Sequence, residues 1–367
     1  MEATEAPTTV KEKKRKGRRP SGRVTMQTIA ERVGVSQATV SYVLNNKPGA
    51  RVSAAVRAEI LRLARELNYY PNEAARRLAG MRSRTLGILQ LYVRHSVLAG
   101  WWSSEIMRGI ADVGFAEGYH LMIYAMSEDV REMCLNAVYS GRLEGLIILA
   151  PHKHEPLLKE LCDADIPLAA VGTQQVYGCK MVAVDADNEM GGYLATRHLI
   201  EQGHRRIAHL HGMLSIPNAY DRYQGYLRAL QDADIPIEHD LLAQTDFSER
   251  GACEATQRLL QLPNPPTAIF AANDVSAIGA LRAVKDAGLR VPDDIAIIGY
   301  DGAPITELTE PPLSTVQQPA ADMGRVAARL LIEVIEGNTP AERVVKLPVH
   351  LLVRASSHCN ISGMTQL

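Results

Sequence analysis

The order of apolar and polar positions divides the chain into a helical head and a longer body in which strands and helices alternate. In the head, apolar residues recur at the i, i+3, i+4 spacing of amphipathic helices in two segments on either side of Gly34. Gly34 permits a sharp turn, and the Ser36 side chain can cap the second helix. A third amphipathic helix is predicted over residues 53–67. The apolar positions of the first two helices are Ile29, Ala30 and Val33, then Val40, Val43 and Leu44.

The predicted second helix carries small, hydrogen-bonding residues on the side away from its apolar stripe. Such a row suits the edges of base pairs in the major groove of DNA. The three helices therefore indicate a helix-turn-helix unit that reads DNA. The outward positions are Gln37, Ala38, Ser41, Tyr42 and Asn45.

A short segment after the third helix has the pattern of a hinge. Pro71 favours a helix start and Gly80 a helix end, which predicts about two helical turns between them. Isolated helices of that length are marginal in water, so this one could order on DNA and disorder away from it. Leu78, beside Arg76 and Arg77, could enter a minor groove as an apolar wedge flanked by cations. The alternative is a linker in which Leu78 packs on its neighbours.

After residue 83, apolar runs of strand length alternate with helical patterns. This alternation predicts parallel sheets covered by helices on both faces, arranged as two linked α/β halves. Strands are predicted over 85–91, 120–125, 143–149, 167–172, 180–185, 206–211, 267–271 and 295–300. Helices are predicted over 103–117, 129–141, 188–202, 219–233, 249–262 and 274–287.

Several polar residues follow the predicted strands of the body. Ligands of such sheets bind beyond the carboxyl ends of the strands, so these residues are candidates for a binding site. Each taken singly could be a helix cap or a surface residue, but several converging from different strand ends indicate binding. The candidates are Arg222, Asn273, Asp274 and Asp301.

Charge is distributed unevenly along the chain. Residues 1–85 hold 18 Lys and Arg against 7 Asp and Glu, a formal net charge of +11. The remaining residues hold 22 against 34, a net charge of −12. A basic head favours a polyanionic partner with salt-dependent affinity, while the acidic body is repelled by the same partner. The basic run over 11–20 is predicted to be a disordered arm that adds DNA contacts or only aids solubility.

Composition excludes several classes of protein. The 367 residues are 46% hydrophobic, enough for two or three cores, and the sequence shows neither a membrane span nor a secretory signal. We therefore expect a cytoplasmic protein. The scattered cysteines lack a Cys-x-x-Cys pair and are expected to be reduced thiols. They are Cys134, Cys162, Cys179, Cys253 and Cys359.

Enzymatic and metal-binding motifs are also missing from the sequence. It contains no phosphate-binding loop, no Gly-x-Ser-x-Gly elbow and no His-Glu-x-x-His pair, so we expect neither an enzyme nor a cofactor. The pairs His209/His211 and His152/His154 could bind a metal, but structural histidines are the preferred interpretation and no metal site is expected. A transport receptor with a similar body would carry a signal peptide and would lack a DNA-binding head. The sequence meets neither condition, so we do not expect a transport receptor.

The motifs of the chain, in order, resemble those of the lactose/galactose repressor (LacI-type) family of bacterial transcription regulators. The resemblance extends from about residue 24 to about residue 356 and implies a bilobal body like that of periplasmic binding proteins. The matching segments are 29–41 (IAERVGVSQATVS), 68–72 (NYYPN), 74–80 (AARRLAG), 203–207 (GHRRI), 222–226 (RYQGY), 272–274 (AND), 291–295 (VPDDI), 299–301 (GYD) and 312–315 (PLST).

The resemblance implies roles for residues in the head and the hinge. The head would bind as one half of a dimer on a pseudo-palindromic operator, and Leu78 would wedge into the operator's centre with Arg76 and Arg77 beside it. Base-reading positions would be Gln37, Ala38 and Tyr42, and phosphate-contacting positions would be Thr25, Ser36, Thr39, Ser41, Asn45 and Ser53.

The resemblance also implies an effector site in the body. Arg222, Asn273 and Asp301 match polar groups that hold a small effector, and Phe247 matches an aromatic residue that stacks on a sugar ring. Trp101 or Trp102 would supply a second apolar wall, and Gln318, near the crossover between the lobes, is a further candidate.

Some residues depart from the pattern of the family. Thr28 stands where relatives often carry Asp or Glu, which weakens or replaces a capping interaction, and Tyr42 stands where many carry Arg or His. Tyr42 cannot make a bidentate contact with guanine. Residues 170–175 lack the carboxylate of some sugar-binding members, and the tail lacks the leucine heptads of a tetramerising coiled coil.

The expected organisation follows from these patterns. It comprises a disordered basic arm over 1–22, the helix-turn-helix domain over 23–70, a hinge helix over 71–82, a core over 83–356 and a tail over 357–367. Lobe 1 of the core is expected over 83–185 and 319–342, and lobe 2 over 186–315 and 343–356. The expected function is a nucleoid-associated, homodimeric repressor controlled by a sugar or sugar derivative. The alternative is an activator or dual regulator that responds to a non-sugar metabolite.

Overall fold

The computed structural model describes residues 24–45, 52–70, 82–90, 100–125, 130–153, 155–175 and 180–358. The chain separates into two compact units, residues 1–81 and residues 82–367. The predicted hinge residues Arg76, Arg77 and Leu78 lie outside the described residues, as does the basic arm.

The first unit is the predicted three-helix head, built from α1 (Met26–Val33), α2 (Gln37–Leu44) and α3 (Ala54–Glu66). Ile29, Val40 and Ile60, one from each helix, are fully buried in its core. Gly34 ends α1 in the left-handed conformation at φ 75°, and the Ser36 hydroxyl accepts a hydrogen bond from the Thr39 N–H at 3.1 Å. The turn and the cap that the sequence predicted are therefore confirmed.

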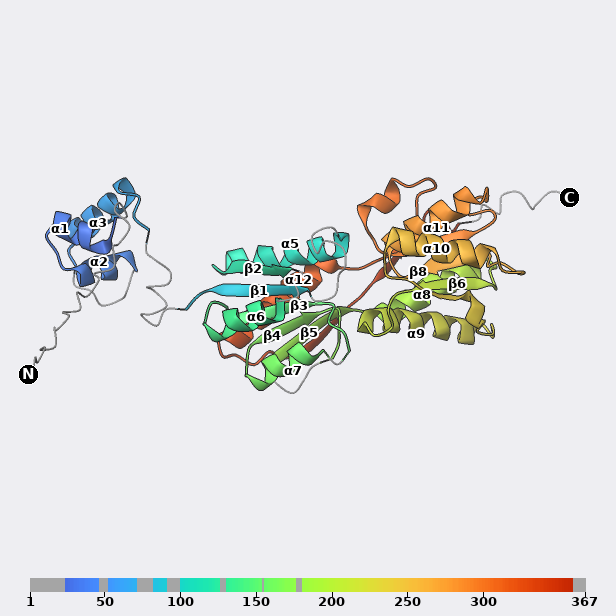
Figure 1. Cartoon of the computed structure of the whole chain (residues 1–367), viewed down its shortest axis with the longest axis horizontal. Helices are drawn as coiled ribbons and strands as arrows, with labels where there is room; N and C mark the ends of the chain where they lie inside the picture. The colour runs from blue at the N-terminus through green and yellow to red at the C-terminus, as the bar shows by residue number, and fades with distance from the viewer. Residues whose placement is uncertain are drawn as a thin grey trace, which may run out of the picture. The chain divides into compact units, whose positions relative to one another are not determined.

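Lobe 1 of the second unit is a six-stranded parallel sheet in the order β11-β5-β4-β3-β1-β2. Helices α5 and α12 pack on one face of this sheet, and α6 and α7 pack on the other (Figure 1). The strands are β1 (Thr85–Gln90), β2 (His120–Ala125), β3 (Gly145–Leu149), β4 (Leu168–Val171), β5 (Met181–Ala186) and β11 (Val344–Leu347). The helices are α5 (Trp101–Ala116), α6 (Val130–Tyr139), α7 (Pro156–Asp163) and α12 (Ala320–Ile335).

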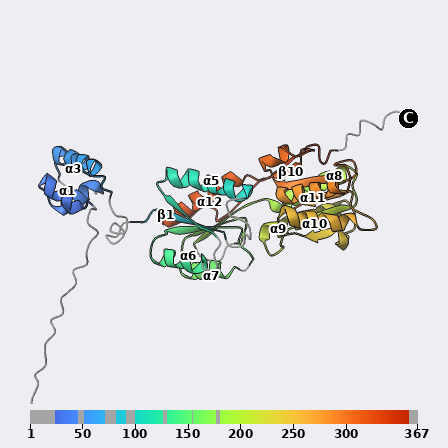
Figure 2. The ribbon, with the colours of Figure 1, turned by 45° about the horizontal axis from the view of Figure 1, so that its top comes forward.

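Lobe 2 repeats this plan with a sheet in the order β12-β10-β9-β8-β6-β7, in which only the β10–β12 pairing is antiparallel. Helices α8 and α9 cover one face, and α10 and α11 cover the other (Figure 2). The strands are β6 (Ile207–His211), β7 (Leu242–Gln244), β8 (Ala268–Ala271), β9 (Ala296–Asp301), β10 (Ser314–Gln317) and β12 (His350–Leu352). The helices are α8 (Asn188–Glu201), α9 (Pro217–Asp232), α10 (Glu249–Leu260), α11 (Asp274–Asp286) and the short η1 (His239–Leu241) and η2 (Pro304–Glu307).

All eight predicted strands and all six predicted body helices are present, and the bilobal α/β architecture is confirmed. One lobe boundary is wrong. The sequence places residues 343–356 in lobe 2, and β12 of this range does pair with β10 of lobe 2. However, β11 pairs with β5 of lobe 1, where Val344 lies opposite Ala183. This strand is a four-residue edge strand with half-exposed side chains, so its sequence has no strong apolar run. Sequence patterning also missed α7, α12, β7, β10 and β12.

Helices α8 and α9 pack closely against each other in lobe 2, and this packing positions residues of the candidate site. A Cβ atom on Gly192 of α8 would lie 2.1 Å from the Arg222 carbonyl oxygen of α9, and one on Gly225 would lie 2.0 Å from the Glu189 carbonyl oxygen. Only glycine permits this approach, which brings the start of α8 against the first turns of α9. Across the described residues, no helix combines the length and apolar character that crossing a membrane requires.

Candidate DNA-binding surface and effector site

The outward side of α2 presents the predicted base-reading residues. Gln37, Ala38 and Tyr42 are exposed, and 45% of the Tyr42 surface is accessible to solvent. Val40 and Val43 on the opposite side are buried in the head core, so packing fixes which side of α2 faces outward. These three side chains are accessible for contact with base edges in a major groove.

Three of the six predicted phosphate-contacting residues are helix N-caps. Thr25, Ser36 and Ser53 cap α1, α2 and α3, and each hydroxyl oxygen accepts a hydrogen bond from a backbone N–H. Helix N-termini attract phosphate oxygens through their free N–H groups and the helix dipole. Asn45 is tied to the end of α2, where its Nδ2 donates to the Ser41 carbonyl oxygen at 2.9 Å.

Thr28 forms a neutral capping box with Thr25 at the start of α1. The Thr28 N–H donates to the Thr25 Oγ1 at 3.3 Å, and the Thr25 N–H donates to the Thr28 Oγ1 at 3.4 Å. The capping interaction is therefore replaced by a pair of hydroxyls and is not lost.

In the second unit, Arg222 is the centre of a buried polar cluster. Its side chain extends from α9 and is 3% exposed. Its Nε donates to the Asn188 Oδ1 at 2.9 Å and its Nη1 donates to the Ala272 carbonyl oxygen at 2.5 Å. The guanidinium carbon lies 3.9 Å from the centroid of the Tyr300 ring, a cation–π contact. Arg222 thus joins the start of α8 to the carboxyl ends of β8 and β9.

Asp301 and Gln318 lie at the carboxyl ends of two neighbouring strands, β9 and β10. The Gln318 Nε2 donates to the Asp301 Oδ1 at 2.7 Å. Burial raises the pKa of Asp301 above its usual value, and the positive charge of Arg222 opposes that shift. The structure thus brings Arg222, Asp301 and Gln318, which the sequence predicted separately, into one cluster.

Asn273 and Phe247 form the adjoining part of this site. The Asn273 Oδ1 caps α11 by accepting from the Ser276 N–H at 2.9 Å, and its Nδ2 donates to the Phe247 carbonyl oxygen at 3.3 Å. The Phe247 ring lies against Gly212, where an added Cβ would approach the ring to 1.9 Å. Because Ala272, the residue before Asn273, accepts from Arg222, this aromatic wall adjoins the arginine cluster.

Trp102 is a residue of lobe 1 that lies near the arginine cluster of lobe 2. A Cβ on Gly172, just after β4, would lie 3.3 Å from both the Trp102 ring and the Asn218 Nδ2. Asn218 is one helical turn before Arg222 on α9, so Trp102 lies where the two lobes meet. Trp101 packs beside the main core, and no described contact joins it to the arginine cluster. The two lobes also meet where the Lys153 N–H donates to the Ser215 carbonyl oxygen at 2.9 Å.

Sequence reasoning missed three polar residues that complete the cluster. The Asp185 Oδ1 accepts from the Asn188 Nδ2 at 2.8 Å, and burial raises the pKa of Asp185 to about 7. The Tyr300 ring lies under the Arg222 guanidinium. Asp185 ends a predicted strand and Asn188 starts a predicted helix, so the rule of polar residues at strand ends could have found both. No local pattern marks Tyr300, because its role depends on packing.

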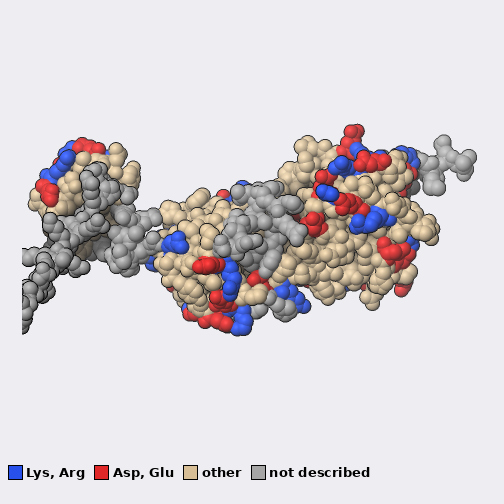
Figure 3. Space-filling model, viewed as in Figure 1, with Lys and Arg blue, Asp and Glu red and all other residues tan. Residues whose placement is uncertain are grey.

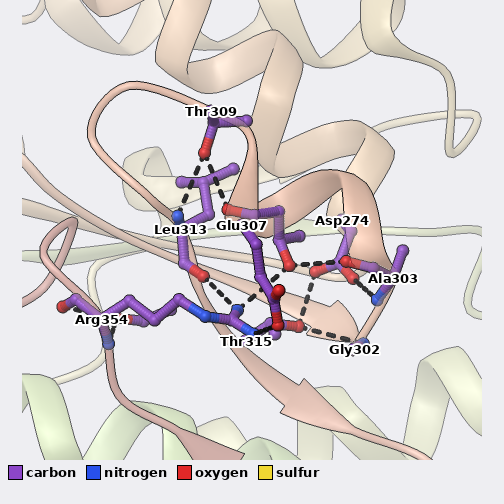
Figure 4. Close-up of polar contacts among 10 residues, drawn as sticks. Asp274, Gly302, Ala303, Glu307, Thr309, Leu313, Thr315 and Arg354 are labelled. Atoms are coloured by element: carbon purple, nitrogen blue, oxygen red, sulfur yellow. Dashed lines mark hydrogen bonds and ion pairs between the residues drawn. The ribbon is translucent and has the colours of Figure 1, made fainter.

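Asp274, which the strand-end rule also selected, holds a loop in place (Figure 4). The Asp274 Oδ1 accepts from the Thr315 hydroxyl at 2.6 Å, and its Oδ2 accepts from the Ala303 N–H at 2.7 Å. Arg354 binds the same loop farther along, where its Nη1 donates to the Thr306 hydroxyl and to the Leu313 carbonyl oxygen at 2.7 Å. These contacts fix the segment between β9 and β10.

The sequence favours structural roles for the two histidine pairs, and His154 of the second pair lies outside the described residues. His209 is fully buried, stacks on Phe270 at a centroid distance of 4.6 Å, and has its Nδ1 2.9 Å from the Phe270 carbonyl oxygen. Burial lowers the pKa of His209 to about 3, so the ring is a neutral core group. In the part of the chain that the structure describes, no group of three or more His, Cys, Asp or Glu could hold a metal ion.

The cysteines differ from one another. Cys134 and Cys253 are free and buried. Cys162 is disulfide-bonded, so the expectation that all five cysteines are reduced is wrong at this position.

Two family models match the chain, one over the head and one over part of the body. Residues 25–72 match the model described as bacterial regulatory proteins, lacI family, and residues 196–357 match a periplasmic binding protein-like domain. The transcriptional regulator CelR of Thermobifida fusca is 34% identical over 336 residues, which cover 91% of this chain and 98% of CelR. The chain belongs to the lacI family.

Other relatives and solved structures agree with this assignment. The transcriptional repressor PurR of Aliivibrio salmonicida is 31% identical, over 91% of this chain and 99% of PurR. The lac repressor dimer bound to operator and the anti-inducer ONPF has a TM-score of 0.81 at 29% identity, over 92% of this chain and all of that chain. The complex of CelR with cellobiose has a TM-score of 0.70 at 32% identity, over 91% of this chain and all of that chain. This lacI-family member is therefore a DNA-binding transcription regulator and not an enzyme.

Proposed function

We propose that this regulator is a cytoplasmic, nucleoid-associated repressor that binds a pseudo-palindromic operator as a homodimer. Its affinity for DNA is controlled by a small effector, a sugar or sugar derivative, held between the two lobes. One observation carries the effector site: Arg222, Asp301 and Gln318 come from different elements and form one buried cluster that adjoins Trp102 of the other lobe. The competing proposal is an activator or dual regulator that responds to a non-sugar metabolite.

The chemistry of the cluster suits a sugar. The Asn273 amide and the Asp301 carboxylate fix hydroxyl orientation by donating and accepting hydrogen bonds, and Phe247 and Trp102 offer apolar faces to a pyranose or furanose ring. Two relatives have been solved with sugars, CelR with cellobiose and a LacI-family regulator from Enterococcus faecium with ribose.

The homodimer is supported by apolar side chains exposed on both lobes. Phe115 and Tyr139 of lobe 1 are 66% and 63% exposed, and Leu308 of lobe 2 is 81% exposed. Ile305, on η2 just before Leu308, is also exposed. Ile305 and Leu308 are neighbours on the segment between β9 and β10, and exposed apolar side chains that adjoin one another mark interaction surfaces. A two-fold dimer would cover the same residues on both subunits. On the face of the body that Figure 3 shows, acidic and basic side chains lie interspersed.

DNA recognition is assigned to the head and the hinge. Gln37, Ala38 and Tyr42 read bases, while Thr25, Ser36, Thr39, Ser41, Asn45 and Ser53 contact phosphates. Leu78, with Arg76 and Arg77, enters the minor groove at the operator's centre. The last three residues lie outside the described residues, so this assignment rests on their match to the family motif alone.

The test is selection of operators from random duplex DNA by the purified full-length protein at a fixed salt concentration. We expect a palindrome whose two halves are read by two copies of α2. Selected duplexes with no two-fold symmetry would overturn the dimeric operator. Release of the selected operator by added sugars then tests the effector, and release only by non-sugar metabolites would favour the competing proposal.

A further inference from the structure

We propose that the effector is an uncharged, hydroxyl-rich sugar, not a phosphorylated or carboxylated derivative, and that Gln90 and Trp102 read its hydroxyl groups from lobe 1. This inference rests on the proposed effector site between the lobes. It adds the chemical class of the ligand and a residue, Gln90, that the sequence did not mark.

Buried polar atoms without partners carry the inference. Gln90 is the last residue of β1 and only 6% exposed, yet its Oε1 has no hydrogen-bond partner among the described residues. The same holds for the Gln318 Oε1, the Asp185 Oδ2 and the Trp102 Nε1. Buried polar atoms are otherwise paired, because leaving them unpaired after desolvation is unfavourable. A ligand that supplies the partners accounts for all four.

Three of the four unpaired atoms belong to lobe 1, and the fourth, the Gln318 Oε1, lies just beyond the carboxyl end of β10 in lobe 2. Gln90 and Asp185 are near the carboxyl ends of β1 and β5, which are parallel strands of one sheet. Gln90 is on the same face of β1 as Leu86 and Ile88, whose core cluster includes residues of α5 and α12. Trp102 is in the first turn of α5, and Gln318 comes just before α12. All four residues therefore lie near the ends of sheet strands or in the first turn of a helix, and ligands of parallel sheets bind beyond the carboxyl ends of the strands.

The balance of donors and acceptors defines the class of ligand. The amide oxygens of Gln90 and Gln318 are acceptors and need N–H or O–H donors, while the Trp102 Nε1 is a donor and needs an acceptor. The Asp185 Oδ2 accepts when its carboxyl group is ionised and can donate when that group is protonated. A hydroxyl group both donates and accepts, so a sugar with several free hydroxyls satisfies all four. An ionised phosphate or carboxylate group accepts hydrogen bonds but supplies few or no donors.

Charge also disfavours an anionic ligand. Asp185 and Asp301 are buried beside the same cluster, and burial already raises the pKa of both carboxyl groups. The nearby Arg222 guanidinium is engaged by Asn188, Ala272 and the Tyr300 ring. A phosphate placed here would add negative charge next to two acidic groups, while the Arg222 Nε and Nη1 already donate to protein acceptors.

Binding of matched sugar pairs to the full-length protein tests the class of ligand. The probes are glucose and glucose 6-phosphate, ribose and ribose 5-phosphate, and cellobiose and cellobionic acid, measured by calorimetry. We expect at least one neutral member to bind, with its charged partner about 100-fold weaker or more. Equal or tighter binding of a charged member overturns the inference. Binding by no member of any pair also overturns it, while the selected palindrome would still support the dimeric regulator.

Gln90→Met tests the residue, since methionine fills a similar volume without the unpaired oxygen. We expect affinity for the neutral sugar to fall about 10-fold, while the melting temperature without sugar stays equal or rises because the buried acceptor is gone. Trp102→Phe should likewise weaken sugar binding. Gln231→Met, on the exposed side of α9, is the matched control and should change neither value. A Gln90→Met protein that melts earlier and binds sugar normally would show that Gln90 has only a structural role.

Discussion

Tyr42 is the residue whose proposed contribution to DNA reading can be isolated by a single substitution. It is the only large exposed side chain among the three base-reading candidates, and it projects from α2. A phenol donates and accepts one hydrogen bond each through a single oxygen, whereas arginine presents a fork that matches guanine. The operator of this regulator should therefore differ from those of arginine-bearing relatives at one position in each half-site.

Tyr42→Phe isolates that hydroxyl. If the hydroxyl bonds a base, the variant should lose about 1–2 kcal/mol of discrimination at one half-site position and keep its preference elsewhere. Parallel selections by the two proteins at equal salt would measure this. Indistinguishable base preferences would assign Tyr42 to packing against DNA and remove it from the reading set.

At the scale of elements, the sequence predicts most of the strands and helices of the body. The prediction fails where the local pattern of apolar residues is weak. Strands such as β3, buried on both faces, have continuous apolar runs that mark them. The edge strand β11 has no such run, and its partner β5 is about 160 residues away in the chain, so only tertiary pairing defines it. Tertiary packing also explains why the contacts within the candidate site could not be predicted from the sequence. Arg222 could be selected from its motif, but its contact with Tyr300 depends on how α9 packs on β9.

The segment between β9 and β10 shows how a distant residue controls an element. Arg354, beyond β12, donates to the Leu313 carbonyl oxygen and the Thr306 hydroxyl, and its Nη2 reaches Glu307 at 2.9 Å (Figure 4). The same segment presents Ile305 and Leu308 to solvent. Arg354 is thus a positioning residue for the apolar surface that we assign to the dimer.

Arg354→Met should separate the buried contacts of this arginine from its exposed ion pair. Loss of the guanidinium leaves the Leu313 carbonyl oxygen without this donor, so we expect unfolding to become easier by about 1–3 kcal/mol. Glu307→Gln removes only the ion pair, whose acidic partner is largely exposed, and should cost under about 1 kcal/mol. Urea denaturation of both variants gives the comparison. Equal losses would mean that the ion pair, and not the buried contacts, holds the segment.

For the whole molecule, the opposite charges of head and body favour DNA contact through the head, but charge alone does not provide specificity. Residues 1–85 carry a formal net charge of +11, and the rest of the chain carries −12. Such a head binds any duplex, with affinity that falls as salt rises. Specificity for a palindrome requires two heads held together, because the second head then binds at a high effective concentration. The dimer surface should therefore matter more for operator DNA than for random DNA.

Leu308→Asp tests this dependence directly. A carboxylate in an apolar dimer surface would be buried without a partner, so we expect sedimentation of the variant to change from dimer to monomer at micromolar concentration. Specific operator binding should weaken about 100-fold or more, while binding to random duplex should change by less than about 10-fold, since each head still contacts phosphates. Ile237→Asp, at another exposed apolar position of lobe 2, controls for added charge and should leave both properties unchanged. A Leu308→Asp protein that stays dimeric would move the interface away from η2. One that is monomeric yet binds the operator normally would show that a single head suffices, contrary to the two-head operator we propose.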